Sequence, residues 1–281
     1  GLPYVLIVAI VPLIGDMDKF VLAFLDLDSE LPIYDVAWRL QMAGATLVIA
    51  IQGTLLTAIA RDLHSPKQLH NIRLLSSRST SRIVALGLAV GPVAGIVLVP
   101  IMFGQEYSSA ADVLILLIAA WSVCMMTSPL LVGVRAGCRG RDLQLALIVG
   151  IFADGLVTYL LAERLGASSA GFGTIAMFWI SGFLCLQPLR QHGLSNLFSM
   201  MDMMISLIAT IGMCVIFYMR VIENNSSLML VLAFSFSTSL CVLAFNKVAH
   251  QSHSQIDISF TQTDDGAFDH SLTDSMSDIT R

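Results

Sequence analysis

Four ionisable residues interrupt otherwise apolar stretches of this sequence, and they are its strongest candidates for chemistry: Asp16, Lys19, Arg39 and Asp154. An ionised side chain at the centre of a membrane helix costs at least about 2.5 kcal/mol, so such residues tend to be functional. The two cations would suit a phosphate or pyrophosphate group, which Arg chelates and Lys meets as a point charge. The two carboxylates would balance those cations, or bind a coupling proton or sodium ion.

The depths of these residues along their helices agree with one another. Asp16 and Asp154 both lie roughly 17–20 Å from one face of a hydrocarbon core about 30 Å thick. Lys19 follows Asp16 by three residues and so shares its helix face. We therefore expect the four side chains to share one water-filled cavity. In the alternative interpretation Arg39 extends to the membrane interface, and Asp18 only ends the first apolar stretch.

Membrane-spanning helices must carry these residues. Of the 281 residues 56% are hydrophobic and only 12% are charged, and the mean hydropathy is +0.79. Soluble domains have about 25% charged residues, and a spanning helix needs about 20 mostly apolar ones. We therefore predict an all-α fold, a polytopic transmembrane helix bundle. About eight segments qualify as transmembrane helices: 3–25, 34–60, 82–103, 111–133, 143–162, 168–189, 202–220 and 227–246.

The distribution of Lys and Arg supports this division. Ten of these cations lie in the loops after every second segment or just past the eighth, and only two lie in the loops between. Cytoplasmic loops of membrane proteins carry such an excess, so both termini are expected in the cytoplasm. The net charge of −5 belongs to residues 248–281, which we expect to form a disordered acidic tail. Segment 61–81 is expected as a solvated basic loop or a short interfacial helix.

Small residues and prolines mark positions of close helix packing or bending. Gly87, Gly91 and Gly95 recur every fourth residue, a spacing that lets two membrane helices approach closely. Pro92 and Pro129 each remove a backbone donor from a predicted span, which produces a kink. These kinks are candidate hinges for a conformational change.

Several function classes lack their sequence features here. The sequence contains no P-loop, no GxSxG nucleophile motif and no HExxH metal motif, so we expect neither an enzyme nor a metal site. No cofactor is expected beyond the coupling proton or sodium ion. The sequence has no basic stripe with interleaved aromatic residues, so we expect no nucleic-acid partner. Four of the five cysteines lie in apolar stretches, which is typical of buried thiols.

Three short motifs resemble a known family in their order and spacing. They are Asp18-Lys19 followed by PIYDVAWRL at 32–40, then FGQEYSSA at 103–110, and LGASSAGFGT at 165–174. They are similar to motifs in the C-terminal half of the polysaccharide (O-antigen type) flippases. These flippases belong to the multidrug/oligosaccharidyl-lipid/polysaccharide exporter superfamily. The sequence departs from the family pattern at Lys19, where Arg is usual, and at Asp154, where Asn is common.

The resemblance implies two six-helix lobes that form a V around a central cavity. By alternating access they would carry a lipid-linked, pyrophosphate-bearing oligosaccharide across the bacterial inner membrane, with Lys19 and Arg39 receiving its anionic head. Residues 1–190 would be the six-helix C-terminal lobe, 191–247 two additional transmembrane helices, and 248–281 the tail. An N-terminal lobe missing from this sequence, or a second copy, would complete the V.

Three other functions remain open. The chain could be a non-transporting membrane scaffold or partner subunit, in which the buried charges pair with another chain. It could instead be a related drug/cation antiporter. A membrane-embedded transferase would need an outward-facing acid/base pair, for which Glu106 and Asp112 are the nearest candidates.

Overall fold

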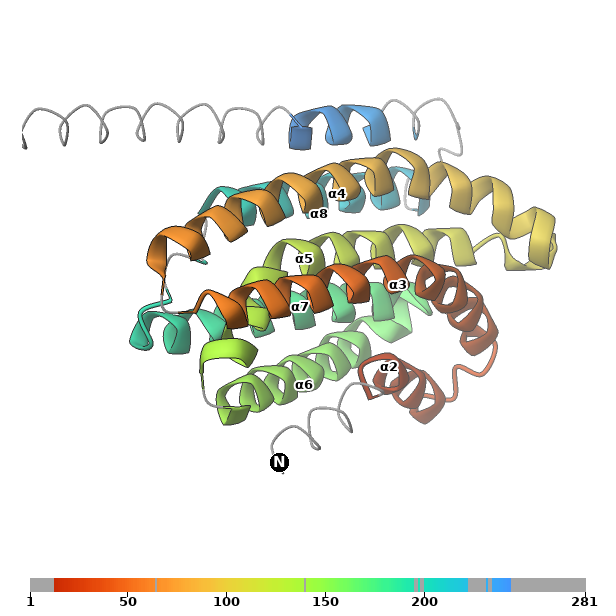
Figure 1. Cartoon of the computed structure of the whole chain (residues 1–281). Coiled ribbons are helices and arrows are strands. Elements are labelled where there is room, and N and C mark those ends of the chain that lie inside the picture. Colours follow the sequence, from red (N-terminus) through yellow and green to blue (C-terminus); the bar gives the residue numbers. More distant parts are fainter. Residues whose placement is uncertain are drawn as a thin grey trace, which may run out of the picture.

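Long α-helices make up the described part of the chain in the computed structural model (Figure 1). The structure describes residues 13–63, 65–138, 140–194, 197, 200–221, 231 and 234–243, and within these it has no strand. The helices are α2 (Leu13–Phe24), α3 (Glu30–Arg61), α4 (Pro66–Phe103), α5 (Ala110–Gly137), α6 (Gly140–Leu165), α7 (Ser168–Gln191) and α8 (Met200–Val221), with a short 3-10 helix η1 (Gln105–Tyr107). The all-α prediction is confirmed.

Five of these helices, α4 to α8, are long and apolar enough to cross a membrane. Two shorter apolar helical segments, Ile49–Arg61 within α3 and Phe234–Leu243, accompany them. The chain is therefore a multi-pass membrane protein. The predicted first span reaches back to residue 3 and the eighth runs over 227–246, so both extend beyond the described residues. The predicted tail, 248–281, lies outside them entirely.

Of the two predictions for segment 61–81, the basic loop is wrong; residues 66–81 are helical, but they belong to a long helix and do not form a short one. Helix α4 starts at Pro66, which stands at its first position after an extended Ser65, and it then runs for 38 residues. That is about 57 Å, nearly twice the hydrocarbon thickness of a bilayer. Its first turns are amphipathic: Leu69 is buried in a cluster with Leu55 and Ile59 of α3, while the cations of this segment raise its polarity in a hydropathy average.

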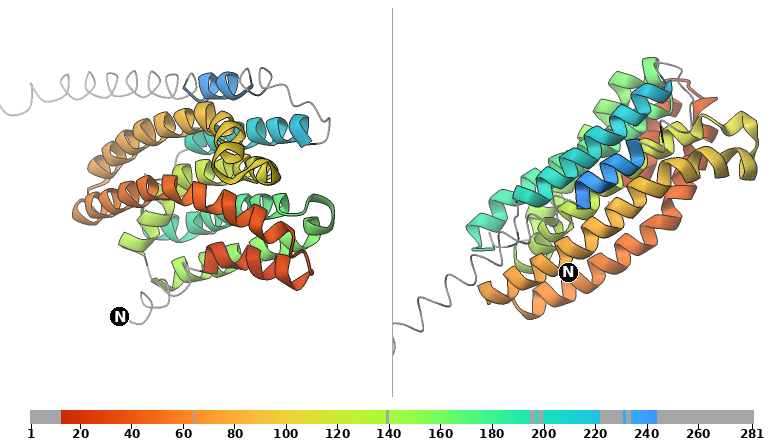
Figure 2. Two further views of the ribbon diagram at one scale, coloured as in Figure 1. Left: turned by 90° about the vertical axis from the view of Figure 1, so that its right-hand side faces the viewer. Right: turned by 90° about the horizontal axis from the view of Figure 1, so that it is seen from above.

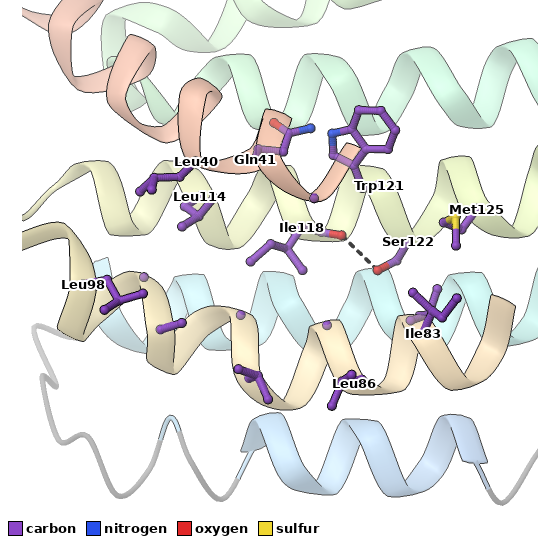
Figure 3. A pocket seen from close by; sticks show the side chains of 17 residues that line it. Leu40, Gln41, Ile83, Leu86, Leu98, Leu114, Ile118, Trp121, Ser122 and Met125 are labelled. Carbon is purple, nitrogen blue, oxygen red and sulfur yellow. Dashed lines mark hydrogen bonds between the residues drawn. The ribbon is translucent and has the colours of Figure 1, made fainter. Parts of the chain in front are cut away.

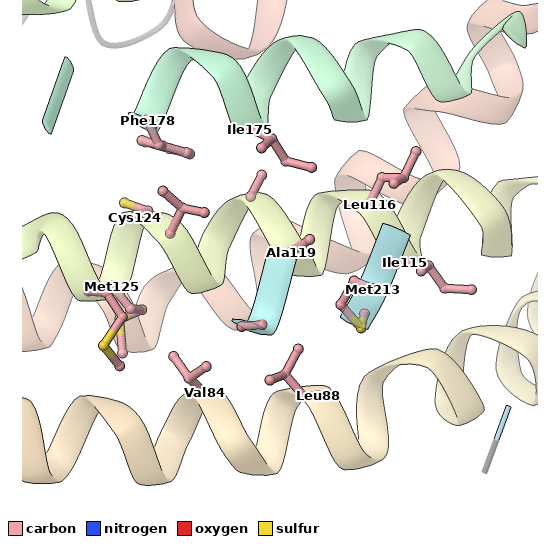
Figure 4. Close-up of a cluster of buried hydrophobic side chains, with 14 of the residues drawn as sticks. Val84, Leu88, Ile115, Leu116, Ala119, Cys124, Met125, Ile175, Phe178 and Met213 are labelled. Carbon is pink, nitrogen blue, oxygen red and sulfur yellow. The ribbon is translucent and has the colours of Figure 1, made fainter. Parts of the chain in front are cut away.

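Helix α5 is the central element of the bundle. Its apolar window is 89% buried, against 33% for those of α4 and α8. Figure 1 shows α5 between α4 and α8 on one side and α7 on the other, and the side chains of these helices meet in one core (Figure 4). This core includes Val84 and Leu88, Ile115 and Ala119, Phe178, and Met213. The central position explains why α5 carries almost no charge.

Ionic and polar contacts tie α8 to the bundle at both ends. Arg220 forms a half-buried ion pair with Asp112 at the start of α5. At the other end, the Ser77 hydroxyl of α4 donates to the buried Asp202 carboxylate. Between these contacts α8 rises about 27 Å. Segment 234–243 lies along α4 and α8 (Figure 2), where the Ser239 hydroxyl donates to the carbonyl of Ala85 at 2.8 Å.

A glutamate at the start of α3 holds the turn between α6 and α7. The Glu30 carboxylate accepts a hydrogen bond from the backbone N–H of Ala167 at 2.8 Å, at the N-terminus of α7. Gly166 has a φ of +53°, a conformation that favours glycine, and a Cβ there would lie 2.5 Å from the Glu30 carboxylate. This contact joins α3, α6 and α7 at one end of the bundle.

Candidate functional site

The fully buried carboxylate of Asp18 on α2 accepts hydrogen bonds from hydroxyl groups of three other helices. The Tyr34 hydroxyl of α3 donates to Asp18 Oδ2 at 2.9 Å, and the Thr158 hydroxyl of α6 donates to Asp18 Oδ1 at 2.8 Å. The Thr174 hydroxyl of α7 adds a longer bond of 3.4 Å to Oδ2. Asp18 has no exposed surface. Asp18 is thus the centre of a hydrogen-bonded polar cluster where α2, α3, α6 and α7 meet. It does not simply end an apolar stretch.

A second buried carboxylate, Asp154 of α6, lies against the first. Its carboxyl group is within hydrogen-bonding reach of Asp18. Neither of its oxygens accepts a hydrogen bond from a donor group among the residues that the structure describes. Two ionised carboxylates in contact repel each other, and an unpaired buried charge is costly. The pair is therefore stable when it holds a proton or binds a cation.

The groups around this pair suit a proton or a hard cation. Every polar atom in reach is an oxygen, from the two carboxyl groups and the hydroxyls of Tyr34, Thr158 and Thr174. Oxygen ligands suit hard cations, whereas transition metals favour nitrogen or sulfur. In the described ranges no group of three or more His, Cys, Asp or Glu side chains could hold a metal ion.

A cavity of about 600 Å³ lies on another face of α2. Its lining includes Asp16 and Lys19 from α2 and Asp35 from α3. The Lys19 ammonium is 2.9 Å from Asp35 Oδ1, and the exposed Arg39 guanidinium is 2.7 Å from Asp35 Oδ2. Asp35 thus bridges the two cations that the sequence predicts to bind an anion. In this arrangement a carboxylate of the protein occupies the position between them that an anionic group would take.

The structure brings some of the predicted site residues together and separates others. Asp16 and Lys19 line the same cavity, and Arg39 reaches it through Asp35. Asp154 does not line this cavity and lies in the carboxyl pair instead. The reason is the helical repeat of about 100° per residue, which turns Asp18 to a different face of α2 from Asp16 and Lys19. The expected single cavity is therefore two polar sites on one short helix.

Sequence reasoning missed the partners of these predicted residues. Thr158 follows Asp154 by four residues, a spacing that places both on one face of α6, so this pair was detectable from the sequence. Asp35 precedes Arg39 by the same spacing. Tyr34 and Thr174 carry no comparable signal, because they meet Asp18 only through tertiary packing.

The predicted packing and hinge residues lie mainly at the contact between α4 and α5. A Cβ on Gly91 would lie 2.5 Å from Ile118, and one on Gly95 would lie 3.0 Å from Leu114, so both glycines permit close approach. Gly87 faces open space, with no atom within 4 Å of such a Cβ. Pro92 and Pro129 lie buried inside α4 and α5. Ser128, next to Pro129, donates its hydroxyl to the Cys124 carbonyl at 2.8 Å.

The described residues therefore form a helical membrane bundle with a buried carboxyl pair, Asp18 and Asp154, and a nearby cavity whose charged lining residues are Asp16, Lys19 and Asp35. Comparison with protein-family models, with curated proteins and with solved structures finds no match to this chain.

Proposed function

We propose that the chain is one lobe of a flippase that moves a lipid-linked, pyrophosphate-bearing oligosaccharide across the bacterial inner membrane by alternating access. In this proposal both termini lie in the cytoplasm. The second lobe of the V comes from a longer chain or from a second copy. The observation that carries the proposal is the buried pair of Asp18 and Asp154, because an unbalanced carboxyl pair inside a membrane bundle is typical of ion-coupled transporters.

The two cations beside this cavity, Lys19 and Arg39, support an anionic cargo. Lys19 and Arg39 converge on Asp35, so their positive charge is held in place by a single carboxylate. A pyrophosphate group offers more acceptor oxygens and more charge than Asp35 does, and it would replace that carboxylate between the two cations.

Helix α2 links the two sites physically. Asp18 belongs to the carboxyl pair, and Asp16 and Lys19 on the same 12-residue helix line the cavity. A bound proton or sodium ion would remove one of the two negative charges of the carboxyl pair and so relieve the repulsion within it. When both carboxyl groups are ionised, their repulsion loosens the packing of α2 against α6 and shifts Lys19 with it. Helix α2 would in this way couple ion binding at the carboxyl pair to cargo binding at Lys19.

The proposal is tested with the full-length transporter in proteoliposomes. The cargo is a fluorescent polyprenyl pyrophosphate disaccharide, whose accessibility to dithionite reports flipping. Asp154→Asn keeps the shape of the side chain and removes the repulsion with Asp18. We expect flipping to fall by at least about tenfold and to lose its dependence on proton or sodium gradients. Asp26→Asn, an exposed position on the α2–α3 turn, is the matched control.

The other outcomes identify the alternative functions. If flipping by Asp154→Asn still depends on the proton or sodium gradient as in the wild type, the carboxyl pair does not couple the ion to transport. Transport of a cationic dye in place of the anionic lipid would indicate a drug/cation antiporter. A folded protein that moves neither probe would indicate a scaffold or partner subunit.

A further inference from the structure

A second cavity, of about 620 Å³, lies between α3, α4 and α5 (Figure 3) and shares no lining residue with the cavity at Lys19 and Asp35. Seventeen residues line it, and none of them is charged. Its volume is within the range of about 300–1,000 Å³ that is usual for sites of small ligands. An uncharged lining excludes a phosphate group from the interior of this cavity and favours an apolar occupant.

Two polar side chains in this lining have unused hydrogen-bonding groups. Gln41 of α3 is only 6% exposed, and both its amide oxygen and its amide nitrogen lack a partner among the described residues. In the same part of the chain, the indole nitrogen of Trp121 on α5 is also buried and without a partner. Ser122, by contrast, donates to the carbonyl of Ile118 at 2.9 Å. Buried polar groups are normally paired, so the two side chains indicate an occupant with a polar atom.

Part of the lining that α4 contributes is exposed at the surface of the described bundle. Leu86 is 65% exposed, and Val90 and Leu98 of the same lining are exposed as well. Gly87 leaves its part of the lining empty, because a Cβ there would meet nothing within 4 Å. In a membrane bundle this exposed apolar surface contacts lipid tails. A lipid chain can therefore enter sideways from the bilayer.

We propose that this cavity binds one ester-linked acyl chain of a bilayer glycerolipid, whose ester carbonyl accepts a hydrogen bond from the Gln41 amide or the Trp121 indole. The hydrocarbon chain matches the apolar walls, and the carbonyl matches the two unused donors. The phosphate of the headgroup stays outside the uncharged interior. This site is independent of the proposed cargo and of the carboxyl pair.

The experiment compares two photoreactive lipids that differ only in one linkage. Both carry a diazirine on the same chain, which is joined to glycerol by an ester in one lipid and by an ether in the other. The full chain in nanodiscs is labelled with each lipid, and mass spectrometry measures labelling of α3, α4 and α5. We expect the ester lipid to label these helices about two- to tenfold more than the ether lipid. Gln41→Leu and Trp121→Phe should each lower this ratio toward one.

A pair of glycine variants tests the cavity itself. Gly87→Leu fills the cavity and should abolish labelling by both lipids. Gly53→Leu adds the same side chain at another helical glycine with open space around it, outside the lining, and should leave labelling unchanged. Equal labelling by both lipids, or full labelling of Gly87→Leu, would overturn the proposal.

Discussion

Gly173 of α7 packs directly against the carboxyl group of Asp154 on α6, and a Cβ at this position would overlap both Asp154 Oδ1 and Thr158 Oγ1. Only glycine at this position leaves room for the Asp154 carboxyl group between these two helices. Any side chain at position 173 would displace the Asp154 carboxyl group, which faces Asp18. The close packing of α6 against α7 and the geometry of the carboxyl pair therefore depend on the same residue. It therefore offers a way to perturb the pair without changing either carboxylate.

The variant Gly173→Ala should destabilise the protein by about 1–3 kcal/mol, because the added methyl group overpacks the contact between α6 and α7. Gly53→Ala is the matched control: it lies in α3 with open space around it, and Ala is favoured over Gly inside a helix. Thermal unfolding in detergent measures both variants. Equal stability of Gly173→Ala and the wild type would show that the carboxyl pair is not closely packed.

The variant Asp35→Asn should strengthen binding of inorganic pyrophosphate by about two- to fivefold. The substitution removes the carboxylate that Lys19 and Arg39 share, so both cations become available to an anion. Isothermal titration calorimetry on the detergent-solubilised protein measures the affinity. Raising the salt concentration should reduce the gain, since these side chains are partly exposed.

The control for this prediction is Lys19→Gln combined with Asp35→Asn. One of the two cations is then lost, and the gain in affinity should disappear. A gain that persists in the double variant would mean that pyrophosphate binds elsewhere on the protein.

The variant Arg220→Ala should cost about 3–5 kcal/mol of stability, because it leaves Asp112 half-buried without its partner. Arg220→Met combined with Asp112→Leu replaces the pair by apolar groups and should recover most of that loss. Thermal unfolding of the three proteins in nanodiscs provides the comparison. A small effect of the single substitution would show that the contact at Ser77 and Asp202 is sufficient to hold α8.

Alkylation of Cys138 should be slow in the folded protein. Burial raises the pKa of this thiol, at the end of α5, to about 11, and nearby Asp142 adds to the effect. The reactive thiolate is therefore scarce at neutral pH. A variant that keeps only Cys138 should react with iodoacetamide about a hundredfold more slowly when folded than in SDS, and its rate should rise about tenfold per pH unit. Equal rates in both states would contradict this burial.

The sequence could predict the spanning helices, because apolar length is a local property. The predicted segments 111–133, 143–162, 168–189 and 202–220 each lie inside one helix of the structure. It could not predict that α4 continues back to Pro66. Lys and Arg dominate the hydropathy of that stretch, whereas the burial of Leu69 against α3 depends on tertiary packing.

The candidate site was predictable only as a set of residues at one depth. Depth fixes where Asp16 and Asp154 lie along their helices, but not which way each side chain points. Asp18 and Asp154 are 136 residues apart in the chain, and their contact depends on how α2 packs against α6. A helical projection of 13–24 separates Asp18 from Lys19, so the existence of two faces on α2 was within reach of the sequence.

The contact between Glu30 and the N–H of Ala167 limits how this bundle can change shape. The first turn of α3 and the corner between α6 and α7 are fastened together there, so that end of the molecule behaves as a fixed pivot. We therefore expect the largest displacements at the opposite ends of these helices, farthest from this contact.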